Sequence, residues 1–109
     1  MGFFQLFAQS KINDYVKEAG QLPSSILLDV RTPEEYIQGH IPGSVNIPLQ
    51  DLEKASEILT DSSSPLYVYC HSGARSGLAV MLLEKMGYHK IQDMGGISGW
   101  RGTLETGGN

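Results

Sequence analysis

Hydrophobic positions recur at helical spacing in some stretches of the chain and form short continuous runs in others. Residues 10–20 have one apolar helix face, with Ser10 as a possible cap and Gly20 as a stop. Residues 25–30 are a continuous apolar run of β character, typical of a strand covered on both faces. The pattern predicts a helix followed by a central strand of a parallel sheet.

A helix-start signal follows this strand. Thr32 is a suitable cap, Pro33 fits the first turn, and Glu35 is placed to complete a capping box. Because Gly39 comes soon afterwards, the helix is expected to be short.

The rest of the chain continues the alternation of strands and helices. It predicts a turn at 41–43, a short strand at 44–47 and an amphipathic helix at 48–59. After a polar loop at 61–65, it predicts a strand at 65–70, a longer helix at 76–86 and a last strand at 90–94. This alternation favours an α/β fold with a parallel sheet and helices on both faces. Sites in such sheets lie at the carboxyl ends of the strands, so Asp29, Cys70 and the residues after Met94 are expected at one edge.

Length and composition limit the possible functions. The 109 residues suffice for one domain, 1–109, with a single core, and 40% hydrophobic and 18% charged residues are ordinary for an α/β chain. The formal net charge of −4 provides no general electrostatic basis for binding nucleic acid or an anionic membrane. An anionic ligand would therefore need a local site.

The two ends of the chain have a different character. Residues 1–9 form an apolar extension without the basic leader or long apolar run of a signal peptide or membrane span. We expect this extension to pack on the domain or on a second subunit, so the oligomeric state stays open. Residues 103–109 are predicted to be a flexible tail. A single cysteine without a secretory leader suggests a cytoplasmic protein.

The only cysteine, Cys70, stands at the end of a predicted strand, just before a glycine-containing loop and a helix. Several backbone N–H groups and the positive end of that helix would point at the sulfur, and Arg75 adds a permanent positive charge. These surroundings favour the thiolate, the form that attacks electrophiles. The alternative is that Cys70 fills the core as a small hydrophobic residue.

Three stretches resemble signatures of the rhodanese, or thiosulfate sulfurtransferase, family in that family's order and spacing. They are LDVR, EEY and GHIPGSVNIP within residues 28–48, YCHSGARSG at 69–77, and GGISGW at 95–100. The resemblance implies a rhodanese-like fold with a five-stranded parallel sheet, a persulfide on Cys70, and sulfur transfer without a metal or organic cofactor.

The resemblance also implies roles for the loop. Cys70 would take the outer sulfur of thiosulfate or a similar donor, and cyanide, a small thiol or a protein thiol would then accept it. Arg75 would neutralise the donor and the leaving sulfite. The loop residues expected at the substrate are His71, Ser72, Gly73, Ala74 and Ser76. For Ser76, however, capping of the following helix is the preferred role, and His71 is expected to face solvent.

Other polar residues have structural interpretations. Asp29 and Arg31 are expected to form an ion pair that supports the site from behind. His40 is expected to stabilise a turn, because no second His or Cys stands at metal-ligand spacing, and no metal site is predicted. Trp100 is expected to pack under the last turn.

Two other functions remain open. Dual-specificity phosphatases of the cell-cycle type, and the arsenate reductases that resemble them, use a Cys-to-Arg loop with five intervening residues, whereas Cys70 and Arg75 enclose four. The second alternative is a non-catalytic rhodanese-like module for interaction or regulation, although such modules often lack the cysteine. A sulfur relay, in which Cys70 receives sulfur from a protein persulfide, is an intermediate case.

Overall fold

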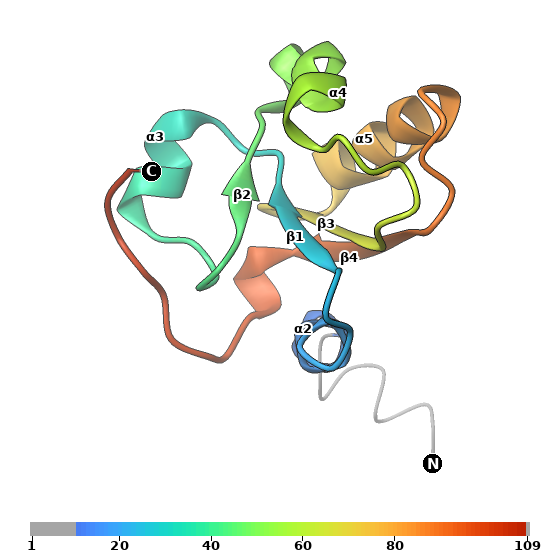
Figure 1. Ribbon diagram of the computed structural model, residues 1–109. Coiled ribbons are helices and arrows are strands. Elements are labelled where there is room, and N and C mark those ends of the chain that lie inside the picture. The colour runs from blue at the N-terminus through green and yellow to red at the C-terminus, as the bar shows by residue number, and fades with distance from the viewer. Residues whose placement is uncertain (1–10, 109) are drawn as a thin grey trace.

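The computed structural model describes residues 11–108, which form a parallel sheet with helices on both faces (Figure 1). The strands, in the spatial order β2-β1-β3-β4, are β1 (Ile26–Asp29), β2 (Val45–Asn46), β3 (Leu66–Cys70) and β4 (Ile91–Gly96). The helices are α2 (Ile12–Ala19), α3 (Pro33–Gln38), α4 (Ala55–Ile58) and α5 (Ala74–Lys85), with 3₁₀ helices η1 (Leu49–Lys54) and η2 (Ile97–Gly99). The predicted α/β architecture is confirmed, but the described residues form four strands where the resemblance implied five.

Alternation along β3 divides the core into two layers. Leu66, Val68 and Cys70 pack in a cluster with residues of η1, α4 and α5. Tyr67 and Tyr69 pack on the other face with residues of α2. Figure 1 shows α2 on one side of the sheet and α4 and α5 on the other. The side chain of Cys70 therefore belongs to the layer beneath α5.

The predicted capping box of α3 is confirmed. The Thr32 hydroxyl accepts a hydrogen bond from the Glu35 amide at 3.2 Å, and the Glu35 carboxylate accepts one from the Thr32 amide at 3.0 Å. Pro33 occupies the first turn, and Gly39 follows the last residue of the helix. The box matters for the site because it fixes the direction of the Glu35 side chain.

Other helix ends differ from the prediction. The amphipathic stretch 48–59 forms η1 and a single turn of α4 rather than one helix, with non-helical backbone at Asp51. The longer helix begins at Ala74 instead of Ser76, directly after Gly73. The N-cap of α2 is Lys11, and Ser10 and the apolar extension 1–9 lie outside the described residues.

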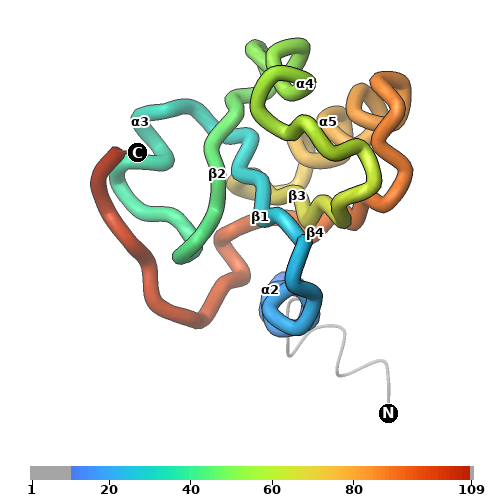
Figure 2. Tube along the Cα trace, in the orientation of Figure 1, coloured from blue at the N-terminus to red at the C-terminus, as the bar shows by residue number. Residues whose placement is uncertain are grey.

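The carboxyl-terminal segment is anchored to the region of α3. Figure 2 shows the chain returning from η2 to α3. His40 and Glu105 exchange backbone hydrogen bonds of 2.9 Å, and the Gly107 amide donates to the Ile37 carbonyl at 2.8 Å. The segment that was predicted as a flexible tail is thus held at two points. Within residues 11–108, no helix is long and apolar enough to cross a membrane.

Candidate active site

Cys70 is the last residue of β3, and its sulfur meets the turn that leads into α5. The Gly73 amide donates a hydrogen bond to Sγ at 3.0 Å. Gly73 has φ = 109°, in the left-handed region that favours glycine, and it immediately precedes the first residue of α5. The loop therefore directs the Gly73 amide at the sulfur, where the sequence predicted several amides.

The thiol itself is covered. Cys70 exposes 1% of its surface and lies in an apolar cluster with Val30 and Ala79. The neighbouring residues His71 and Ser72 are exposed instead. Cys70 is therefore covered in this conformation, and a donor can reach Sγ only after the residues that cover it move.

Arg75 is held by Glu35. Its two terminal nitrogens donate to the two carboxylate oxygens at 2.7 and 3.0 Å, and the side chains of Arg75 and Glu35 are 35% and 30% exposed. This bidentate pairing lowers the pKa of Glu35 from 4.5 to about 2, with hydrogen bonds from Thr32 adding to the effect and partial burial opposing it. It also raises the pKa of Arg75, and the charge interaction with Cys70 contributes to that rise.

Glu35 is thus a site residue that the sequence indicated through its capping box and through the first signature stretch, but without its partner Arg75. Arg75 already has a carboxylate partner, which the sequence did not indicate, and its role in neutralising a substrate stays a prediction.

The prediction that Ser76 caps α5 is wrong, because Gly73 occupies the N-cap position. Ser76 is fully buried, and its hydroxyl donates to the Asp93 carboxylate at 2.8 Å and contacts the Gly73 carbonyl at 3.1 Å. Asp93 also accepts from the Gly95 amide at 2.9 Å. Asp93, which the sequence analysis did not single out, therefore ties β4 to the first turn of α5.

Gly96 allows the reactive loop to lie against β4. A β-carbon at Gly96 would overlap the His71 carbonyl oxygen and lie 2.7 Å from the Ser72 Cα. The Ser98 amide donates to that same carbonyl at 3.2 Å. This close backbone approach gives a physical reason for the glycine in the GGISGW stretch.

The expected ion pair behind the site is confirmed. The Arg31 guanidinium donates to both carboxylate oxygens of Asp29 at 2.7–3.1 Å, and both side chains are buried. Arg31 also donates to the Gly39 carbonyl at 2.7 Å. Asp29 and Arg31 therefore brace the end of β1 against the end of α3.

His40 and Trp100 have the structural roles that were expected. The His40 ring stacks on Tyr36 with 3.7 Å between ring centroids, and its Nδ1 lies 2.7 Å from the Tyr36 carbonyl. The Trp100 indole packs partly against the α2 layer and donates to the Thr103 carbonyl at 2.9 Å. In the described part of the chain, no three His, Cys, Asp or Glu side chains are grouped so that they could hold a metal ion.

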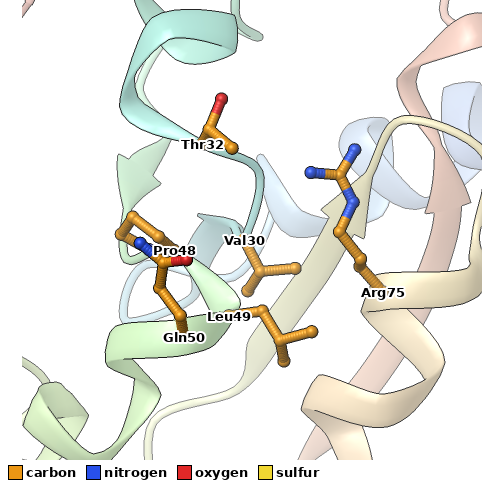
Figure 3. Close-up of a pocket in the computed structure, with 6 residues that line it drawn as sticks. All are labelled: Val30, Thr32, Pro48, Leu49, Gln50 and Arg75. Carbon is orange, nitrogen blue, oxygen red and sulfur yellow. The ribbon is translucent and has the colours of Figure 1, made fainter.

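Two cavities flank the Glu35–Arg75 pair. One of about 200 Å³ is lined by Val30, Thr32, Pro48, Leu49, Gln50 and Arg75, and Figure 3 shows Arg75 on the side of it opposite Thr32 and Pro48. The other, of about 320 Å³, is lined by Arg31, Glu35, Gln38, Gly39, His71, Ile97 and Leu104. The ion pair joins the walls of these two cavities at the carboxyl edge of the sheet.

Comparisons with known proteins identify the family. The family model described as "Rhodanese-like domain" matches residues 12–103. The thiosulfate sulfurtransferase PspE of Escherichia coli is 39% identical over 71 residues, which are 64% of this chain and 68% of that protein. The chain belongs to the rhodanese-like domain family.

Other rhodanese-like relatives have related names. A sulfurtransferase of Allochromatium vinosum is 39% identical over 77 residues, covering 69% of this chain and 70% of that protein. A putative sulfur carrier protein, YrkF of Bacillus subtilis, is 41% identical over 80 residues, which span 72% of this chain and 43% of that protein. A solved structure of a rhodanese with anions from E. coli aligns with a TM-score of 0.71 and 34% identity, over 76% of this chain and 99% of the other. Sulfur transfer is therefore the chemistry of named members of this rhodanese-like family.

Proposed function

We propose that this protein is a sulfurtransferase that carries a sulfane sulfur on Cys70 as a persulfide, taken from thiosulfate or a related donor. The observation that carries the proposal is the 3.0 Å hydrogen bond from the Gly73 amide to Sγ, at the amino end of α5. An N–H group directed at sulfur stabilises negative charge on the thiolate and on the persulfide. The similarity to named sulfurtransferases supports the same chemistry.

The reaction is a pair of displacements at sulfur. The Cys70 thiolate attacks the outer sulfur of thiosulfate, the Sγ–S bond forms, the S–S bond of the donor breaks, and sulfite leaves with the bonding electron pair. Cyanide or a thiolate then attacks the outer sulfur of the persulfide, and the Cys70 thiolate is the leaving group. Each step conserves charge and needs no external oxidant.

The surrounding residues have proposed roles in these steps. The loop residues His71 to Ala74 form the rim through which the donor enters, and Arg75, in the first turn of α5, provides a positive charge near that rim. Ser76 holds the base of the loop through Asp93. A free thiol persists in a reducing compartment, so we propose the cytoplasm as the location.

The burial of Cys70 favours a second candidate function. A cysteine that exposes 1% of its surface in an apolar cluster is also what a non-catalytic interaction module would contain. The sulfurtransferase proposal therefore requires that the loop opens transiently, a motion on the timescale ordinary for protein loops.

Intact-mass spectrometry separates the two candidates. We expect the purified protein to gain one sulfur atom from thiosulfate or from cysteine persulfide, and to lose it to cyanide with release of thiocyanate. Cys70→Ser should abolish both signals, whereas the control Ser56→Ala, at an exposed position on α4, should retain them. If neither donor adds sulfur to the wild type, the transferase proposal is wrong and the interaction module is favoured. Hydrolysis of a phosphate ester without sulfur uptake would support the phosphatase alternative.

A further inference from the structure

The two arginines that line the cavities at the carboxyl edge of the sheet, Arg31 and Arg75, are both paired with carboxylates. Arg31 is paired with Asp29 through three contacts, and Arg75 is paired with Glu35 through two. Each pair is bidentate, the geometry in which guanidinium and carboxylate charges offset each other most closely. The described wall of the site therefore contains positive groups but little net positive charge.

Glu35 cannot easily turn away from Arg75. Its Oε1 atom also accepts hydrogen bonds from the Thr32 amide at 3.0 Å and from the Thr32 hydroxyl at 3.1 Å. The carboxylate is therefore fixed by its own helix as well as by Arg75. It lines the cavity of about 320 Å³ that also contains His71 of the reactive loop. An anion entering there meets the negative charge of Glu35 and the paired guanidinium of Arg31, whereas Arg75 lines the adjoining cavity.

We propose that Glu35 determines donor specificity, by disfavouring the thiosulfate dianion relative to an organic persulfide with at most one negative charge on its sulfur atoms. This inference rests on the proposed sulfur transfer at Cys70. With such a donor, RSSH, the thiolate attacks the outer sulfur, the Sγ–S bond forms, and the S–S bond breaks. The leaving thiolate RS⁻ takes the electron pair, and the proton remains on the new Cys70 persulfide. The leaving group thus carries one charge, where sulfite carries two.

The test is the Glu35→Gln variant. Glutamine is accepted in a capping box, so the variant keeps the start of α3 while it removes one negative charge. We expect kcat/KM with thiosulfate to rise about tenfold, the size of effect that follows from removing a charge beside a partly desolvated anion site. With cysteine persulfide as donor, kcat/KM should change by less than about twofold.

Two controls isolate the charge effect. Glu34→Gln, at the exposed neighbouring position of α3, removes one negative charge outside the ion pair. It should leave kcat/KM with either donor unchanged. The double variant Glu35→Gln/Arg75→Met should lose the gain with thiosulfate, because the gain requires an uncompensated guanidinium.

Ionic strength supplies a test on the unaltered protein. For the wild type, kcat/KM with thiosulfate should change by less than about twofold between about 0.02 and 0.3 M ionic strength, because the site carries little net charge. For Glu35→Gln it should fall by about fivefold or more over the same range.

The outcomes distinguish this inference from the proposed function. If Cys70 is loaded with sulfur but Glu35→Gln leaves the preference between donors unchanged, the specificity role is overturned. A steep fall of wild-type thiosulfate activity with salt would overturn it as well, even if Glu35→Gln failed to fold. If neither donor loads Cys70 in the wild type, the proposed function fails before donor choice can arise.

Discussion

The Glu35 carboxylate accepts hydrogen bonds from Thr32 and Arg75, so one side chain links the start of α3 to the start of α5. The contact with Thr32 can be predicted from the sequence, whereas the contact with Arg75 cannot. The capping box depends on residues three positions apart and could be predicted. The partnership with Arg75 joins residues 40 positions apart, and no local pattern indicates it.

The ion pair should be visible in the pH dependence of stability. The pKa of Glu35 is lowered from 4.5 to about 2 in the folded protein, so its ionised form stabilises the fold above pH 4.5 and this contribution is lost as the pH falls toward 2. We expect Glu35→Gln to be less stable than the wild type at neutral pH and the two proteins to converge near pH 2. Urea unfolding at a series of pH values measures the difference. A difference in the free energy of unfolding that stays constant across this pH range would contradict the ion-pair explanation.

Cys70 illustrates a second limit of residue-scale reasoning. Its chemical surroundings, a strand end and a glycine-containing turn, follow from the sequence. Its burial does not, because the alternation of β3 and the position of α5 together decide that Sγ lies under a helix.

At the scale of elements, the close contact between β4 and the loop after β3 positions the sulfur. Cys70 is the register partner of Gly96, and the loop backbone passes directly over that glycine. Asp93 and Ser76 then join β4 to the first turn of α5. The reactive loop is therefore supported by a strand that comes later in the chain.

Gly96→Ala should displace the reactive loop. The added methyl group would overlap backbone atoms of His71 and Ser72, which cannot rotate away, so we expect a loss of about 1–3 kcal/mol in the free energy of unfolding. Sulfur uptake by Cys70 should also slow. Chemical unfolding and intact-mass kinetics measure the two effects.

A matched substitution in α5 provides the control. A β-carbon at Gly77 makes only ordinary contact, 3.7 Å from an Asp93 carboxylate oxygen, and alanine is favoured over glycine in a helix. Gly77→Ala should leave stability unchanged or raise it by about 1 kcal/mol or less. Equal effects of the two substitutions would refute the steric argument.

At the scale of the whole molecule, the strand order β2-β1-β3-β4 gathers the functional residues at one edge. Asp29, Cys70 and Gly96 end three neighbouring parallel strands, so the ion pair, the thiol and the loop support lie together. The carboxyl-terminal segment closes this edge, because Leu104 lines the same cavity as Arg31 and His71.

Removal of residues 103–109 should loosen the region around α3. Three backbone hydrogen bonds to Ile37 and His40 would be lost, and at about 0.5–1.5 kcal/mol each we expect a stability loss of about 1.5–4.5 kcal/mol. Hydrogen exchange at the His40 amide should become faster. Glu105→Ala is the control, because it keeps the backbone bonds and should leave that exchange unchanged. Slow exchange in the truncated protein would show that the segment does not anchor α3.

The sequence by itself determined the alternation of strands and helices, the capping of α3 and the position of Cys70 at a strand end. These features depend on side-chain periodicity and turn chemistry within a few residues. Only the tertiary structure decided that Arg75 is compensated by Glu35, that Asp93 binds Ser76, and that Cys70 is covered. These contacts depend on which strands become neighbours and which face each helix covers, and that choice is made by the packing of the whole chain.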